Sequence, residues 1–163
     1  MDFTARRHEM VARQLEGRDI SDARVLEKIG ALPRELFLPP EMSDQAYEDR
    51  AVPVGYGQTI SQPYIVAFMT QLLHTAPDLD VLEIGTGTGY QTALLAMLSR
   101  RVYTVERIEA LATAARERIE RLGLTNVSFR VGDGSEGWAE HAPTIASWSR
   151  RRPRAPCRSL PRS

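Results

Sequence analysis

Three glycines and a carboxylate stand close together in the middle of the chain. Residues 80–90 read D-V-L-E-I-G-T-G-T-G-Y, so an apolar run with the composition of a buried strand leads directly into Gly85, Gly87 and Gly89. The residues that follow predict a helix, and a glycine turn between a strand and a helix lets backbone N–H groups approach a ligand. The G-x-G-x-G spacing is one residue tighter than the dinucleotide pattern. With Glu83 inside the strand end, it indicates an S-adenosylmethionine site, and the alternative is a tight turn without a ligand.

Two further carboxylates follow runs that we expect to be strands. Glu106 ends the run R-V-Y-T-V at residues 101–105, and Asp133 stands between two glycines after the run at residues 127–131. We interpret Glu106 as an acceptor for both hydroxyls of a ribose, the alternative being an ordinary solvated residue. Asp133 fits either an acceptor for the adenine amino group or a turn residue bonded to its own backbone. Glu83 fits a role in fixing the glycine turn or in binding the methionine amino group.

A serine hydroxyl stands just before an apolar helix. Residues 58–64 read Q-T-I-S-Q-P-Y, and Pro63 suits the first position of a helix that we expect to run to His74. Ser61 can cap this helix. It can instead present an exposed hydroxyl, beside free helix N–H groups, to a substrate carboxylate. The local sequence leaves both interpretations open.

Methyl transfer from a sulfonium to a carboxylate would suit these residues. The donor is already activated, and a carboxylate acceptor, with a reference pKa of about 4, is ionised at neutral pH. The protein then has to align the two groups and exclude water, which can contribute about 7–11 kcal/mol. The chain offers no convincing catalytic base or nucleophile–histidine pair, which fits this reaction. Its three histidines are scattered and its single cysteine is Cys157, so we expect neither a metal site nor an internal disulfide.

The expected elements alternate in the second half of the chain. Strands at residues 80–84, 101–105 and 127–131 are separated by helices at residues 91–98 and 109–122. This order predicts an α/β fold with a parallel sheet, in which ligands bind at the carboxyl ends of the strands. The glycine turn and the two later carboxylates all stand at those ends.

The chain divides into three regions by composition. Residues 1–78 read as an N-terminal helical and substrate-loop region, with a first helix capped by Thr4 and a second capped by Ser21. Residues 79–143 read as the first half of a nucleotide-binding sheet, and residues 144–163 as a basic tail. The total of 163 residues fits one domain, or one domain with a small appendage.

The net charge of zero is unevenly distributed along the chain. Residues 144–163 hold six arginines and no acidic residue, so the rest of the chain is acidic. A basic segment of this kind can indicate nucleic-acid binding. No apolar run approaches the roughly 20 residues of a membrane span, and the N-terminus lacks the apolar core of a signal peptide. We therefore expect a cytoplasmic protein.

Several runs resemble one enzyme family. They are M-V-A-R-Q-L, P-R-E-L-F-L-P, G-Q-T-I-S-Q-P-Y-I-V-A, V-L-E-I-G-T-G-T-G-Y-Q-T-A, V-Y-T-V-E-R, and G-D-G followed by G-W. From about Met10 to Pro143 the chain is similar to the protein-L-isoaspartate O-methyltransferases, which methylate isoaspartyl carboxyls in damaged proteins and so start their repair. The glycine pattern is shared by many methyltransferases, whereas G-Q-T-I-S-Q-P is far more specific.

The resemblance implies a Rossmann-like, S-adenosylmethionine-dependent methyltransferase fold and this repair activity. It implies that Ser61 is the active-site residue, whose hydroxyl orients the isoaspartyl carboxylate. It places three neighbours in the substrate site: Thr59, Ile60 and Gln62. It also implies contacts with S-adenosyl-L-methionine from Glu83, Gly85, Thr86, Gly87, Gly89, Glu106, Asp133 and Gly134. We expect a monomer whose partners are isoaspartyl-containing proteins and peptides, with no nucleic acid and no membrane.

The sequence departs from the family pattern after Pro143. The family continues with an aspartate and a fourth strand ending in a turn like V-T-A-A, whereas this chain reads T-I-A-S-W-S-R-R-R-P-R. GC-rich codons for residues 145–153, read in another frame, encode I-V-V-T-A-A-P, so we hypothesise a frameshift. A genomic locus without a downstream frame for the remaining strands would contradict this hypothesis.

The hypothesis changes what we expect of the last part of the chain. The sheet would have about three strands, residues 144–163 would lack regular structure, and the basic tail would be a by-product rather than a nucleic-acid site. The chain would have little or no methyltransferase activity, although its ancestry would be that of the enzyme. The alternatives are an inactive or cofactor-binding-only fragment and another S-adenosylmethionine-dependent methyltransferase. A nicotinamide-dependent oxidoreductase is disfavoured by the tight glycine spacing.

Overall fold

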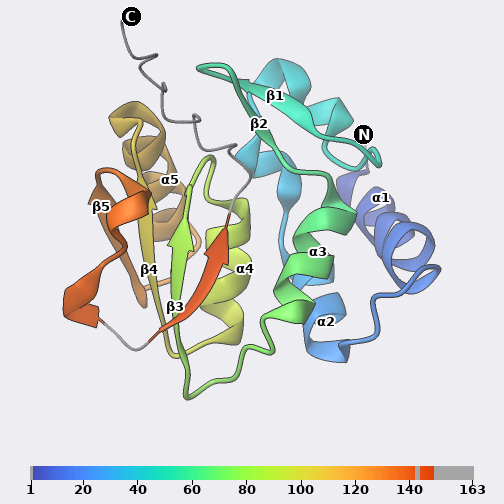
Figure 1. Cartoon of the computed structure of the whole chain (residues 1–163). Helices are drawn as coiled ribbons and strands as arrows, with labels where there is room; N and C mark the ends of the chain where they lie inside the picture. Colours follow the sequence, from blue (N-terminus) through green and yellow to red (C-terminus); the bar gives the residue numbers. More distant parts are fainter. Residues whose placement is uncertain (1, 142–143, 149–163) are drawn as a thin grey trace, which may run out of the picture.

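A parallel sheet forms one side of the molecule (Figure 1). The computed structural model describes residues 2–141 and 144–148. Its strand order is β5 (Val127–Val131), β4 (Arg101–Glu106), β3 (Asp80–Ile84) and β6 (Ile145–Trp148), and all neighbouring pairs run parallel. The α/β fold and the parallel sheet expected from the sequence are confirmed.

The register of the sheet aligns the carboxyl ends of its strands. Ile84 at the end of β3 lies opposite Val105, and Glu106 at the end of β4 lies opposite Val131. The chain segments that leave β3, β4 and β5 therefore start at one edge of the sheet, where parallel sheets bind ligands.

The fourth strand corrects two expectations. The sheet has four strands rather than about three, and regular structure continues past Pro143 because β6 pairs with β3 from Ile145 to Trp148. A strand of four residues is too short to show a recognisable alternation of apolar and polar residues in the sequence. Its hydrogen bonds are supplied by pairing with an existing strand. Residues 149–163, the rest of the expected tail, lie outside the described residues.

Two helices connect the strands. α4 (Tyr90–Leu98) links β3 to β4, and α5 (Glu109–Arg121) links β4 to β5. Seven of the nine residues of α4 are buried, since this helix lies between the sheet and the N-terminal helices (Figure 1). α5 buries only one face and is followed by Gly123, whose φ of 71° suits a helix C-terminus.

The N-terminal part is helical, as expected. α1 (Phe3–Met10) continues as a π-helix over Val11–Glu16, and α2 (Ala23–Ala31) and α3 (Pro63–Leu72) follow. Short 3₁₀ segments lie at Arg34–Phe37, Pro40–Gln45, Gly134–Glu136 and Ala139–His141. Among the described residues, no helix has the length and apolar character to cross a membrane.

The caps of the first two helices differ from the sequence-based expectation. Asp2 rather than Thr4 caps α1, and Asp22 rather than Ser21 caps α2. Each aspartate accepts a hydrogen bond from a backbone N–H of the first turn, and its charge also favours the positive end of the helix. An acidic neighbour therefore replaces the expected hydroxyl cap in both helices.

A hairpin that the sequence did not reveal precedes α3. β1 (Val52–Gly55) pairs antiparallel with β2 (Gln58–Ile60). Its tip, residues 55–57, has positive φ throughout, including 53° at the non-glycine Tyr56. Figure 1 shows the hairpin at the end of the molecule toward which β3 points.

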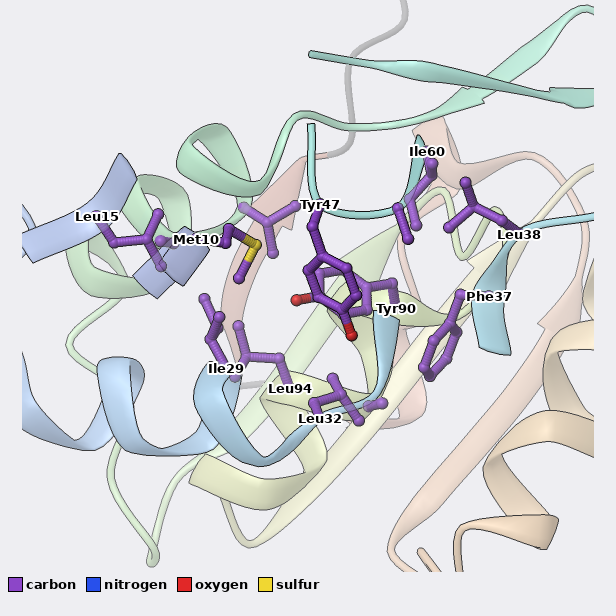
Figure 2. Close-up of a cluster of buried hydrophobic side chains, with 14 of the residues drawn as sticks. Met10, Leu15, Ile29, Leu32, Phe37, Leu38, Tyr47, Ile60, Tyr90 and Leu94 are labelled. Atoms are coloured by element: carbon purple, nitrogen blue, oxygen red, sulfur yellow. The ribbon is translucent and has the colours of Figure 1, made fainter. Parts of the chain in front are cut away.

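One hydrophobic core joins the N-terminal region to the sheet. Figure 2 shows Met10, Leu15 and Ile29 of the N-terminal helices in the same cluster as Tyr90 and Leu94 of α4. All five side chains are at most 2% exposed. The two regions expected at residues 1–78 and 79–143 therefore pack on each other through a shared core.

Aromatic side chains cover Tyr103 on the other face of the sheet. The ring of Tyr103 in β4 stacks on His141 at 3.8 Å and meets Trp138 edge to face at 5.7 Å. These contacts leave Tyr103 only 4% exposed. The segment after β5 therefore closes over β4 before the chain enters β6.

Candidate functional site

The glycine turn after β3 needs its glycines for two reasons. Gly85, Gly87 and Gly89 have φ values of 93°, 56° and 90°, which residues with a Cβ adopt only with strain. At Gly89 an added Cβ would also lie 3.2 Å from the Cβ of Ala115 in α5. At Gly87 it would meet no atom within 4 Å, so the space beside this residue is open. The turn thus packs closely on a helix at Gly89 and leaves room for a ligand at Gly87.

Glu106 holds the glycine turn at the end of β4. Its Oε2 accepts a hydrogen bond from Gly87 N at 2.9 Å, and its Oε1 accepts one from Ile108 N at 3.0 Å. The side chain is buried, so the interpretation of Glu106 as an ordinary solvated residue is wrong. An ionised carboxylate has about four acceptor positions, so further donors can bind to this one.

Glu83 lies beneath the turn and is only 1% exposed. Its Oε2 accepts hydrogen bonds from Thr92 Oγ1 at 2.5 Å and Thr104 Oγ1 at 2.7 Å. Burial raises the pKa of Glu83 to about 7, although both hydroxyl contacts act in the opposite direction. Of its two expected roles, the geometry favours fixing the turn, since so enclosed a side chain presents almost no surface to a ligand.

The side chain of Thr86 joins the same buried network. Its Oγ1 lies 2.6 Å from Thr104 Oγ1. Because Thr104 uses its single hydroxyl proton toward Glu83, Thr86 is the donor in this pair. Thr86 can therefore contact a ligand only through its backbone. Sequence reasoning missed Thr92 and Thr104, whose signal was a hydroxyl within an otherwise apolar helix and strand.

The segment after β5 returns to the glycine turn. Asp133 Oδ1 accepts a hydrogen bond from Ser135 N at 2.9 Å, which forms the expected turn and lowers the pKa of this exposed carboxyl. At Gly134 an added Cβ would lie 2.2 Å from Cγ2 of Ile84, the residue before Gly85. Glycine is thus required for this segment to approach the end of β3, and the approach places Asp133 near the glycine turn.

Ser61 lies between β2 and α3. Gln62 is the N-cap residue of α3 and Pro63 its first helical residue, but no side chain caps the helix, so the capping interpretation of Ser61 is wrong. The Ser61 hydroxyl is half-buried and has no hydrogen-bond partner within the described ranges. It is available to a ligand beside the unpaired N–H groups of the first turn.

The three expected substrate-binding neighbours of Ser61 have different environments. Thr59 is exposed on β2, whereas the Ile60 side chain packs into the hydrophobic core (Figure 2). Gln62 Nε2 donates to the backbone oxygen of Asp49 at 3.1 Å and to Asp49 Oδ1 at 2.7 Å. Of the three side chains, that of Thr59 alone makes no such contact with the residues that the structure describes.

One buried arginine connects Ser61 to the glycine turn. Arg34 Nη2 donates to the backbone oxygen of Ser61 at 2.7 Å, and its guanidinium lies 4.8 Å from the ring centre of Tyr90. Tyr90 directly follows Gly89 and begins α4. A role for Arg34 was not expected from the sequence, although a charged residue beside an apolar, proline-bounded run was a signal.

A hollow elsewhere on the surface is separate from these residues. It lies between α5 and β5 and is lined by residues such as Ile119, Leu124 and Phe129. None of the expected site residues lines it. The residues that the structure brings together at the strand ends are the glycine turn, Glu106 and the segment at Asp133, with Ser61 joined to them through Arg34.

The sequence of the chain matches a known family over most of its length. Residues 5–147 match the family described as protein-L-isoaspartate(D-aspartate) O-methyltransferase. The chain belongs to this family. The match continues past Pro143 into β6, so the family likeness ends later than the sequence-based expectation.

Individual members of the protein-L-isoaspartate O-methyltransferase family are closely similar to the chain. The enzyme of Synechococcus sp. (strain JA-2-3B'a(2-13)) is 55% identical over 141 residues, which are 86% of this chain and 58% of that protein. The enzyme of Magnetococcus marinus is 59% identical over 129 residues, 79% of this chain and 57% of that protein. The chain thus spans about three fifths of the length of these relatives.

Solved structures of family members share the fold. One protein-L-isoaspartate O-methyltransferase is 30% identical with a TM-score of 0.76, over 86% of this chain and 47% of its own. A second, from Plasmodium falciparum in complex with S-adenosyl-L-homocysteine, has a TM-score of 0.65 at 23% identity, over 77% of this chain and 62% of its own. The Rossmann-like methyltransferase fold expected from the sequence is confirmed.

Proposed function

We propose that this chain binds S-adenosylmethionine at the aligned strand ends and transfers its methyl group to the free carboxyl of L-isoaspartyl residues in damaged proteins. The observation that carries the proposal is the bond from Gly87 N to Glu106, which joins an open glycine turn to a carboxylate with spare acceptor capacity. The family relative bound to S-adenosyl-L-homocysteine supports this cofactor. When bound, S-adenosylmethionine supplies an activated methyl group.

The residues at the strand ends fit such a nucleoside. Glu106 can accept hydrogen bonds from ribose hydroxyls while it keeps the turn in place, and Asp133 can accept one from the adenine amino group. The backbone at Gly87 lies beside open space. Glu83 and Thr86 would act from below, by fixing the shape of the turn.

Ser61 would receive the acceptor. Its free hydroxyl and the uncapped first turn of α3 offer N–H and O–H donors to a carboxylate. The acceptor needs no base because it is already ionised, so the chain has only to orient the carboxylate and keep water away. The partner in this proposal is a protein or peptide that contains an isoaspartyl residue.

Replacing Ser61 tests the proposal. We expect Ser61→Ala to lower kcat/KM for an isoaspartyl peptide by about 10- to 100-fold, the effect of losing one hydrogen bond to a charged group. The affinity for S-adenosyl-L-homocysteine, measured by calorimetry, should stay unchanged. Ser128→Ala, an exposed serine within β5, is the matched control and should leave both quantities unchanged.

Two further readouts complete this test. Unchanged activity in Ser61→Ala would refute the role of the hydroxyl, and binding of S-adenosyl-L-homocysteine without any turnover would favour a chain that only binds cofactor. A separate comparison tests the low activity that we expect because the sequence departs from the family pattern after Pro143. In it, kcat/KM of this chain is measured beside that of the Synechococcus relative in the same assay. Light scattering on the same preparation checks the expected monomer.

A further inference from the structure

Arg34 is a fully buried charge without an acidic partner. Its exposure is 0%, and no carboxylate in the part of the chain that the structure describes forms an ion pair with it. Burial lowers its pKa, and the nearby Tyr90 and Tyr47 act in the opposite direction. Removing a charge from water is costly, and a well-packed apolar residue is often as stable or more stable at such a position. Stability alone therefore does not explain an arginine here.

The contacts of Arg34 are all made to parts of the proposed site and its supports. Nε donates to the backbone oxygen of Ala46 at 2.6 Å, and Nη2 donates to the backbone oxygen of Ser61 at 2.7 Å. The central carbon of the guanidinium lies over the ring of Tyr90, and this ring packs edge to face on Phe37 at 5.3 Å. One rigid group thus joins the segment before the hairpin, the turn before α3 and the start of α4.

The bond to Ser61 acts where the backbone has little other support. Ser61 lies in the short connection between β2 and α3, and no side chain caps α3. The only hydrogen bond to Ser61 within the described residues is the one that its carbonyl accepts from Arg34. Fixing this carbonyl restrains the peptide plane between Ser61 and Gln62, and with it the position beside the first turn of α3 from which the Ser61 side chain extends.

We propose that Arg34 is a positioning residue, whose fork holds Ser61 against α3 and in line with the glycine turn, so that the acceptor carboxylate meets the methyl donor. The inference rests on the function proposed above and gives the P-R-E-L-F-L-P segment a role in it. Arg34 acts through Ser61 and Tyr90 and makes no contact with substrate. Because its hydrogen bonds go to the Ala46 and Ser61 carbonyls and it meets Tyr90 only through the ring, we expect its loss to impair methyl transfer to the peptide rather than binding at the nucleoside site.

Two variants of Arg34 test this role. Arg34→Lys keeps the charge but replaces the planar fork by a single ammonium nitrogen, and Arg34→Met keeps only the apolar stem. We expect kcat/KM for an isoaspartyl peptide to fall about 10-fold in the first and about 100-fold in the second, with the affinity for S-adenosyl-L-homocysteine unchanged. The matched control is Arg24→Lys, at an arginine that also bonds a backbone oxygen, that of Thr75 at 2.7 Å, and should behave as wild type.

The outcomes separate this inference from the function on which it rests. Wild-type activity in Arg34→Lys, or a parallel loss of cofactor affinity and activity, would overturn the positioning role while the function stands. A wild-type chain that neither binds nor methylates the peptide would remove both. If the variants do not fold, the Nε–H resonance of Arg34 in wild type provides the test. It should shift on addition of an isoaspartyl peptide but not of the aspartyl peptide, and no shift at saturation would overturn the proposal.

Discussion

Glu83 supports the glycine turn from within the core and presents almost no surface to a ligand. A carboxylate in the strand end reads as a ligand contact in the sequence, but the structure encloses it with Thr92 and Thr104. These bonds tie β3 to α4 and β4 just under the glycine turn. The sequence gives the position of such a residue and not the direction of its side chain, which depends on the pleat of the strand.

The raised pKa of Glu83 makes the stability of the chain depend on pH. Its pKa is about 7 in the folded chain and 4.5 as the reference value, so the folded state holds the proton more tightly. Glu83 stabilises the folded state fully below about pH 4.5, and this contribution to the free energy of unfolding disappears as the pH rises through about 7. Between pH 5 and 8, the free energy of unfolding in urea should fall by on the order of 2–3 kcal/mol more in wild type than in Glu83→Gln.

The control for this prediction is Glu41→Gln, at an exposed carboxylate on the N-terminal side. It should follow the wild-type profile. Parallel profiles for wild type and Glu83→Gln across this pH range would show that the buried carboxylate does not titrate as described.

Much of the site could be predicted at the level of single residues, and the limits have physical causes. The sequence places the glycine turn and Glu106 at strand ends because a strand end has a short, local signature, and the structure brings them together. The bonds of Glu106 to Gly87 N and of Arg34 to the Ser61 carbonyl join residues far apart in the chain. Such contacts depend on the complete fold, so no local pattern contains them.

Secondary-structure elements match their predicted bounds most closely where they have at least five residues. β3 and β5 have the predicted bounds, and α5 ends one residue earlier than predicted. The hairpin β1–β2 and strand β6 were missed because each has only three or four residues per strand. Short strands of this kind are stabilised by their pairing partner rather than by their own composition.

The segment that follows β5 packs closely against the end of β3, where Gly134 meets Ile84. In Gly134→Ala the new Cβ would overlap Cγ2 of Ile84, so the segment after β5 must move away from the glycine turn. We expect a loss of about 1–3 kcal/mol in the free energy of unfolding, as for other overpacked sites, together with weaker binding of S-adenosyl-L-homocysteine.

A neighbouring glycine, Gly132, provides the control for Gly134→Ala. In Gly132→Ala the nearest atom to the new Cβ is Arg130 Nε at 3.7 Å, an ordinary contact, so this variant should be nearly as stable as wild type. Removing the clashing methyl with Ile84→Ala should restore cofactor binding to Gly134→Ala. A Gly134→Ala variant with normal stability and affinity would contradict the close approach.

At the scale of the whole molecule, the N-terminal helices and the sheet depend on each other. Side chains from Met10 to Ile119 contribute to one core cluster, and Arg34 adds a polar link from the N-terminal region to Tyr90 of α4. The substrate side and the cofactor side of the proposed site are therefore positioned by the same packing. Composition suggested separate regions because local patterns do not show which faces pack together.

The function of the whole chain is tested most directly by the chemical identity of its product. An equimolar mixture of an isoaspartyl peptide and its aspartyl counterpart is incubated with the chain and labelled S-adenosylmethionine, and both peptides are analysed by mass spectrometry. We expect a base-labile methyl ester on the isoaspartyl peptide alone, even if the turnover is slow. Label on both peptides alike, or on neither while S-adenosyl-L-homocysteine binds, would contradict the proposed function.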